Sequence, residues 1–187
     1  MARQLDCKIV GSALECIGDD IFSGVQCSPD STCALTQCTG DNSLRVYETG
    51  FQGSSEGAGA EGGCSSPLPR SLSPAVESRE GSSIYDYCWY PKMNSADPAS
   101  CVFLSSSRDH PLHLWDAYNG KLRASYVARD RNDQPEAATC CHFDPTGDFI
   151  YAGYYNAIRV FRTGLPGDDC ELRRTVAAKK RKDGQKG

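Results

Sequence analysis

The sequence lacks the features that would place the protein in a membrane or in the secretory pathway. It has no run of about 18 apolar residues, so no helix is predicted to span a bilayer. The first residues, MARQLDCKIVGSALEC, contain no apolar stretch ahead of a small-residue cleavage site, and no N-x-S/T sequon occurs in the chain. We therefore expect an intracellular protein without a secretory signal.

The chain also lacks the signatures of common enzymes and of structural zinc sites. No G-x-S-x-G motif occurs, and no C-x2-C pair is present. The GAGAEG stretch at 57–62 matches G-x-G-x-x-G, but no strand and helix flank it as dinucleotide binding requires. A zinc site at Cys140, Cys141 and His142 is disfavoured because adjacent strand residues point to opposite faces. We predict no enzymatic activity, no cofactor and no metal.

Cysteine, by contrast, is abundant, with 11 residues in a chain of 187. In a secreted protein such a count would indicate a disulfide framework. Inside the cell, free cysteines pack as small hydrophobic residues. Most of them lie in apolar runs, and we expect these to be reduced core residues: Cys27, Cys33, Cys88, Cys101, Cys140 and Cys141.

Charge is unevenly distributed along the chain. The net charge is −4, yet residues 173–187 carry +6, which leaves −10 on residues 1–172. An acidic body with a basic tail is not typical of a general DNA-binding protein. Any nucleic-acid site must therefore be a local patch.

Three short stretches repeat one pattern of alternating residues. LRVY at 44–47, LHLW at 112–115 and IRVF at 158–161 each contain an apolar residue, a basic or imidazole residue, an apolar residue and an aromatic. Alternation with a period of two indicates strands with two distinct faces. Tight turns upstream, SPDS at 28–31 and DPTG at 144–147, place proline where a type I turn favours it. Each unit therefore reads strand, turn, strand, turn, strand.

The spacing of these units indicates propeller blades. Their aromatic ends are 68 and 46 residues apart, and a period of about 40–45 residues with this order of elements is typical of WD repeats. We expect Tyr47, Trp115 and Phe161 to fill the gaps between adjacent blades. Asp116 is expected to accept hydrogen bonds from the turn that follows it, ahead of an outer strand at 121–126. The predicted fold is all-β, a partial WD-repeat β-propeller of about three four-stranded antiparallel blades.

The predicted organisation has six segments. Residues 50–82 are rich in Gly, Ser and Pro and are predicted to form a flexible insertion. In chain order the segments are an N-terminal lead-in at 1–18, a blade at 19–49, the insertion at 50–82, a blade at 83–127, a blade at 128–175 that begins with a polar loop at 128–135, and a basic tail at 176–187. The KKRK stretch at 179–182 is either a nuclear import signal or a solvated linker.

Several segments resemble one family of WD-repeat proteins. They are CSPDSTCALTQCTGDNSLRVYETG (27–50), IYDYCWY (84–90), SSSRDHPLHLWDAYNGKLRASY (105–126), CHFDPTGDFIYAGYYNAIRVF (141–161) and PGDDCELR (166–173). Together they resemble the telomerase Cajal body protein 1 family. The resemblance implies a non-enzymatic scaffold that binds small Cajal-body RNA and telomerase RNA. It also implies H/ACA ribonucleoprotein and telomerase proteins as partners, a chaperonin for folding, and a location in the nuclear Cajal body after folding in the cytosol.

Candidate RNA contacts lie in turns and at one strand start. They are Tyr85, Arg108, His110, Tyr155 and Asn156, since arginine and aromatic groups suit single-stranded RNA through phosphate contact and stacking. The alternative is that Tyr85 packs between blades and that Arg108 is a solvated turn residue.

Two other functions remain open. The acidic body favours a protein–protein adaptor without RNA affinity. A closed propeller needs at least about four blades, so the chain is also interpreted as a fragment of a longer propeller, or as a non-functional truncated product.

Overall fold

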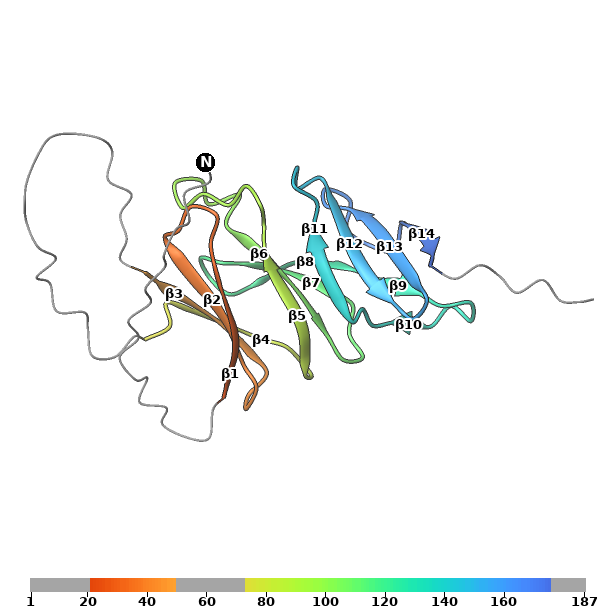
Figure 1. The fold of residues 1–187 in the computed structure, drawn as a ribbon, viewed down its shortest axis with the longest axis horizontal. Coiled ribbons are helices and arrows are strands. Elements are labelled where there is room, and N and C mark those ends of the chain that lie inside the picture. Colours follow the sequence, from red (N-terminus) through yellow and green to blue (C-terminus); the bar gives the residue numbers. More distant parts are fainter. Residues whose placement is uncertain (1–20, 50–72, 176–187) are drawn as a thin grey trace, which may run out of the picture.

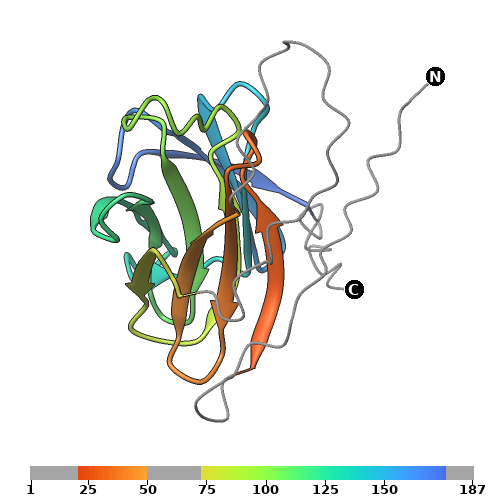
Figure 2. The same ribbon diagram turned by 90° about the vertical axis from the view of Figure 1, so that its left-hand side faces the viewer.

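The computed structural model describes residues 21–49 and 73–175, and every regular element in these two ranges is a β-strand. Three sheets of four antiparallel strands make up most of the fold, and Figures 1 and 2 show them side by side. The sheets are named blade 1, blade 2 and blade 3 in chain order. The predicted fold class, a partial WD-repeat propeller, is therefore confirmed. No helix in the described ranges is long and apolar enough to cross a membrane.

The strands follow one another along the chain in each blade. Blade 1 contains β1 (Phe22–Cys27), β2 (Cys33–Cys38), β3 (Ser43–Glu48) and β4 (Val76–Arg79). Blade 2 contains β5 (Ile84–Trp89), β6 (Val102–Ser107), β7 (Leu112–Asp116) and β8 (Leu122–Tyr126). Blade 3 contains β11 (Cys140–Phe143), β12 (Phe149–Tyr154), β13 (Ala157–Arg162) and β14 (Cys170–Arg174). The three repeated stretches of the sequence are thus the third strands β3, β7 and β13.

The register explains why these third strands share one pattern. Val46 lies opposite Leu35 in blade 1, and Leu114 lies opposite Leu104 in blade 2. The same cross-strand position in blade 3 pairs Val160 with Tyr151. Because side chains alternate along a strand, the basic or imidazole residue and the aromatic residue of each pattern point to the opposite face.

Two stretches that the sequence indicated as loops contain strands. β4 lies inside residues 50–82, so for its four residues the prediction of a flexible insertion is wrong. Its short sequence, VESR, completes blade 1 through pairing with β3, as in Val46 with Val76. The polar loop predicted at 128–135 includes part of a hairpin of β9 (Ala128–Arg129) and β10 (Pro135–Glu136). The strands β4, β9 and β10 are too short to show a periodic pattern.

The core fills the two spaces between neighbouring blades. Blades 1 and 2 share one cluster: Leu35, Leu44, Val46, Ile84, Tyr87, Trp89, Met93, Cys101, Phe103, Trp115 and Ala117. Blades 2 and 3 share the other, together with two residues of the connection between them: Cys88, Val102, Leu104, Leu112, Leu114, Tyr126, Ala128, Ala138, Cys141, Phe143, Ile150, Ala152, Tyr154 and Phe161.

The cysteines only partly follow the prediction. The eight cysteines in the described ranges are free, and Cys88, Cys101 and Cys141 are buried. Cys27 and Cys140 are exposed, so their assignment to the core is wrong. Cys27 is the last residue of β1 and Cys140 is the first residue of β11, so both lie at a terminus of the first strand of a blade.

The turns gather at two opposite ends of the blades. Consecutive turns of an antiparallel meander alternate between its ends, so a second-to-third-strand turn shares its end with the connection into the first strand. We call this end the upper rim, although it points downward in Figure 1; it comprises residues 39–42, 80–83, 108–111, 127–139 and 155–156. The lower rim comprises residues 28–32, 90–101, 117–121, 144–148 and 163–169.

Candidate nucleic-acid interface

The turn of blade 2 brings three of the five candidate RNA contacts together on the upper rim. Arg108 is exposed, and its backbone N–H donates to the Ser83 carbonyl at 2.9 Å. Its guanidinium lies close to the side chain of Tyr85, and this proximity raises the pKa of Arg108. Tyr85 keeps 47% of its surface exposed, so it is available to stack rather than buried between blades.

His110 supports the backbone of this turn instead of facing solvent freely. Its Nδ1 lies 2.7 Å from the Arg108 carbonyl. A carbonyl only accepts, so Nδ1 carries the hydrogen. The ring also lies against Gly81, where an added Cβ would come within 2.6 Å of Nε2. Asp109 holds φ at 62°, a left-handed conformation that Asp and Asn tolerate better than most residues.

The remaining two candidates lie on the same rim, in the turn of blade 3. Tyr155 is 87% exposed, and Asn156 takes the left-handed conformation at φ 55°. The Asn156 carbonyl accepts from the Thr175 N–H at 3.1 Å, which ties the turn to the end of β14. The rim therefore presents an arginine and two exposed tyrosines from neighbouring blades.

A buried carboxylate that the sequence reasoning missed lies directly beneath the blade 2 turn. Glu80 leaves only 1% of its side chain exposed and lies 2.9 Å from Nδ1 of His113. Ser105 and Ser107 donate to it as well, the latter at 3.0 Å. Burial acts to raise the pKa of Glu80, but these three hydrogen bonds outweigh it and lower the pKa below its ordinary value. Glu80 is therefore an anion at neutral pH.

Glu80 could have been identified from the sequence by a spacing that two blades share. Glu80 lies four residues before β5, and Glu136 lies four residues before β11. Glu136 accepts from Arg159 at 3.1 Å, and Arg159 occupies the position in β13 that His113 occupies in β7. In both blades, an acid ahead of the first strand binds the basic or imidazole residue of the third.

Asp41 holds the equivalent turn of blade 1 by a different set of bonds. It accepts from the Ser43 N–H at 3.1 Å, from the Ser43 hydroxyl at 2.6 Å and from Arg45 at 2.8 Å. Burial acts to raise the pKa of Asp41, but bonds from Ser43, Cys38 and Arg45 outweigh it and lower the pKa to about 2.

Acidification is expected to remove the stabilisation that Asp41 provides. Because its pKa is lowered on folding, the carboxylate stabilises the fold above its ordinary pKa of 3.8, and this contribution is lost between that pH and about 2. The urea midpoint of Asp41→Asn should therefore fall less between pH 5 and pH 3 than that of the unmodified chain. Asp148→Asn, at an exposed position on the lower rim, is the control. An unchanged pH dependence in Asp41→Asn would contradict the assignment.

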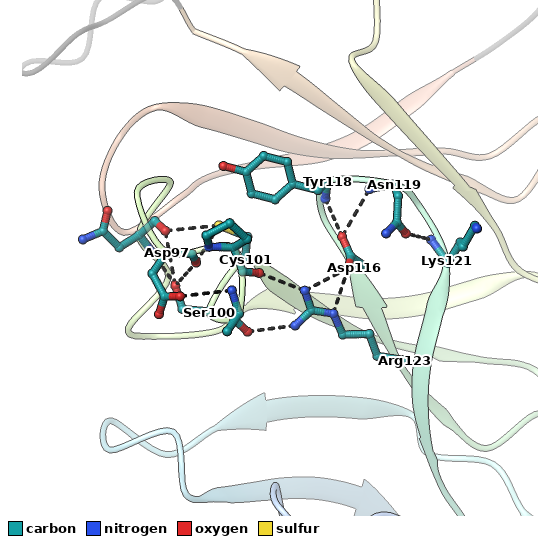
Figure 3. A network of polar contacts seen from close by, with 11 residues as sticks. Asp97, Ser100, Cys101, Asp116, Tyr118, Asn119, Lys121 and Arg123 are labelled. Carbon is teal, nitrogen blue, oxygen red and sulfur yellow. Dashed lines mark hydrogen bonds and ion pairs between the residues drawn. The ribbon is translucent and has the colours of Figure 1, made fainter.

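The lower rim is occupied by a polar network with a structural role (Figure 3). Asp116 Oδ1 accepts from the Tyr118 N–H at 2.7 Å and the Asn119 N–H at 3.2 Å. Its Oδ2 accepts from Arg123, whose guanidinium also donates to the carbonyls of Pro98 and Ala99, both at 2.8 Å. Asp116 and Arg123 thus close the fourth-strand turn and fix the long loop of blade 2.

Two of the three large aromatics of the third strands are buried where blades meet. Trp115 and Phe161 are 8% and 0% exposed and belong to the two inter-blade cores, whereas Tyr47, 7% exposed, is in neither core, and its role between blades stays a prediction. Trp115 lies in the core between blades 1 and 2, and its indole N–H donates to the Ser105 hydroxyl at 2.8 Å. Phe161 packs edge-on against Tyr126 of blade 2, with ring centroids 5.8 Å apart.

The residues present do not form a metal centre in the part of the chain that the structure describes. No three His, Cys, Asp or Glu side chains are grouped there so that they could hold an ion. Cys140 and His142 share a face of β11, whereas Cys141 faces the core. The exposed arginine and tyrosines of the upper rim have the chemistry to contact an anion or to stack on a base.

Comparison with known proteins identifies relatives over most of the chain. No family model matches the sequence. The chain is 39% identical over 169 residues to Telomerase Cajal body protein 1 of Homo sapiens, covering 90% of this chain and 29% of that protein. It is 42% identical over 100 residues to Telomerase Cajal body protein 1 homolog of Drosophila melanogaster, covering 54% of this chain and 18% of that protein.

A further relative carries a different name. Guanine nucleotide-binding protein negative regulator 1 of Schizosaccharomyces pombe is 31% identical over 147 residues, covering 78% of this chain and 35% of that protein. The chain therefore spans about a third or less of the length of these relatives. The resemblance predicted from the sequence is confirmed: curated proteins that are 37–39% identical to this chain over 90% of its length are named Telomerase Cajal body protein 1, and the chain is similar to one part of them.

Proposed function

We propose that this chain is part of a non-enzymatic WD-repeat scaffold that binds small Cajal-body RNA and telomerase RNA and directs them to the nuclear Cajal body. The observation that carries the proposal is the 39% identity over 90% of the chain to a protein named for telomerase and the Cajal body. Proposed partners are the H/ACA ribonucleoprotein and telomerase proteins, with a chaperonin assisting folding in the cytosol.

The upper rim supports RNA as the ligand. Arg108 offers a charge that stays ionised at every physiological pH, and Tyr85 and Tyr155 offer exposed rings. Side chains of these two kinds bind single-stranded RNA through its phosphates and through stacking on unpaired bases. Because the body of the chain is acidic, this local patch has to supply the attraction that the net charge does not.

The proposal is tested by RNA recovery from nuclei. The tagged chain and a longer form containing more of the relatives' length are crosslinked, purified and sequenced for bound RNA. Enrichment of telomerase RNA and H/ACA-type small RNA by both would support recognition within these three blades. Enrichment by the longer form alone would assign RNA binding to the complete propeller, and enrichment by neither would contradict the proposal.

Arg108→Ala is expected to weaken binding of telomerase RNA about fivefold to tenfold, because it removes one charged contact. For the same reason, the slope of log affinity against log salt should decrease by about 0.7. Fluorescence anisotropy with a labelled transcript at several salt concentrations measures both quantities. Arg162→Ala, an exposed arginine at the lower end of β13, is the matched control and should bind normally. Equal losses in the two variants would show that only net charge matters.

A protein–protein adaptor without RNA affinity is the second candidate. It is favoured by the charge of −10 on residues 1–172. Partner proteins recovered from nuclei in amounts that ribonuclease treatment leaves unchanged, together with no enriched RNA, would support this function over the first.

A further inference from the structure

The buried carboxylate of Glu80 is connected to the exposed turn of blade 2 by a continuous set of contacts. It binds Nδ1 of His113 at 2.9 Å. His113 lies next to His110, with ring centroids 6.2 Å apart. His110 in turn binds the Arg108 carbonyl at 2.7 Å.

A second connection runs along the backbone that follows Glu80. Gly81 lies against the His110 ring, and the Ser83 carbonyl accepts from the Arg108 N–H at 2.9 Å. Tyr85, two residues further on, lies close to the Arg108 side chain. The N–H of Arg108 is therefore held directly by the segment that begins at Glu80, and its carbonyl is held through His110.

We propose that Glu80 is a positioning residue for the RNA-binding rim. It touches no RNA itself, but its bonds to His113, Ser105 and Ser107 fix the connection between blades 1 and 2, and this connection fixes Arg108. The inference rests on the proposed function, since it assigns a role toward the same ligand. It adds a buried residue to a site that otherwise consists of exposed side chains.

Burial gives Glu80 the rigidity that this role requires. A side chain that is 1% exposed and accepts three hydrogen bonds has one available position. An arginine on a flexible turn loses conformational entropy when it binds, whereas one that is already held loses less. Removing the charge of Glu80 should therefore weaken RNA binding, because Arg108 is no longer held in place. No side chain that contacts RNA is removed by this change.

A double-mutant cycle tests this role with labelled telomerase RNA as the probe. Glu80→Gln keeps the size of the side chain and removes its charge, and it is expected to weaken binding about fivefold. Combined with Arg108→Ala, it should cause no further loss, because the residue that it positions is already gone. Losses that multiply in the double variant, or normal binding by Glu80→Gln, would overturn the proposal.

Glu136→Gln is the matched control for the cycle. Glu136 stands at the corresponding position ahead of β11 and binds Arg159 at 3.1 Å, away from the blade 2 turn. Its effect on RNA binding should multiply with that of Arg108→Ala, since the two residues are not connected. If Glu136→Gln behaves like Glu80→Gln in the cycle, loss of general stability explains both and the positioning role is wrong.

Hydrogen exchange separates a failure of this inference from a failure of the proposed function. If neither the unmodified chain nor the longer form binds RNA, the proposed function fails, and the exchange rate of the Arg108 amide then tests the positioning role by itself. Exchange of that amide should become about tenfold faster in Glu80→Gln and remain unchanged in Glu136→Gln. An unchanged rate in Glu80→Gln would overturn the positioning role whether or not RNA binds.

Discussion

Replacing Phe161 with alanine is expected to lower the free energy of unfolding by about 3–5 kcal/mol, the typical cost of truncating a fully buried phenylalanine. Phe161 is 0% exposed and packs against Tyr126, which is itself fully buried. Little main chain can collapse into the space, because β12 and β14 flank the residue on both sides. The cavity would open in the core between blades 2 and 3.

Urea unfolding monitored by tryptophan fluorescence measures this effect. Both tryptophans, Trp89 and Trp115, lie in the other core, between blades 1 and 2. A lower midpoint in the tryptophan signal of Phe161→Ala would therefore also show that the blades unfold as one unit. Phe149→Ala, in the same blade but 39% exposed, is the matched control and should cost less than about 1 kcal/mol. Equal losses in the two variants would contradict the burial of Phe161.

Replacing Glu80 with alanine is expected to lower the free energy of unfolding by about 3 kcal/mol, because three donors lose one buried, charged acceptor and a hydrogen bond to a charged group contributes about 1.5–3 kcal/mol. His113, Ser105 and Ser107 would lose their shared acceptor, and the connection between blades 1 and 2 would lose its anchor. Glu171→Ala is the control, because Glu171 and its partner Arg173 are both more than half exposed and such surface pairs contribute at most about 1 kcal/mol. A Glu80→Ala chain as stable as Glu171→Ala would show that the buried network contributes nothing.

The sign of the pH dependence follows from the lowered pKa of Glu80. A carboxyl whose pKa falls on folding stabilises the native state above its ordinary pKa of 4.5, and this contribution is lost as the pH falls further. The difference in urea midpoint between Glu80→Gln and the unmodified chain should therefore be larger at pH 7 than at pH 4. A difference that grows on acidification would contradict the assignment of Glu80 as a native-state anion.

The sequence determined the third strand of each blade and the repeat that groups the strands. The patterns at 44–47, 112–115 and 158–161 predicted β3, β7 and β13, because alternation with an aromatic end is a local property of a half-buried strand. The same reasoning could not find β4 or the β9–β10 hairpin. Strands of two or four residues are too short to carry a periodic pattern, and they form because a neighbouring strand offers backbone hydrogen bonds.

Sequence reasoning predicted the exposed residues of the candidate interface but missed the buried Glu80. Arg108, Tyr85 and Tyr155 stand in or beside turns, and turn residues can be read from the sequence. Glu80 follows a stretch of insertion-like composition, and nothing local distinguishes it from a solvated acid. Its role depends on serines 25 and 27 residues away and a histidine 33 residues away, which only the packed blade brings together.

The sequence by itself thus determined the repeat, the strand order within each blade and the residue types on the rim, because these depend on spacing along the chain. The tertiary structure decided which cysteines are buried, which acid is desolvated and how Arg108 is held. Burial and desolvation depend on what packs across a blade, and the partners of Glu80 and Phe161 come from strands that lie next to one another only after folding.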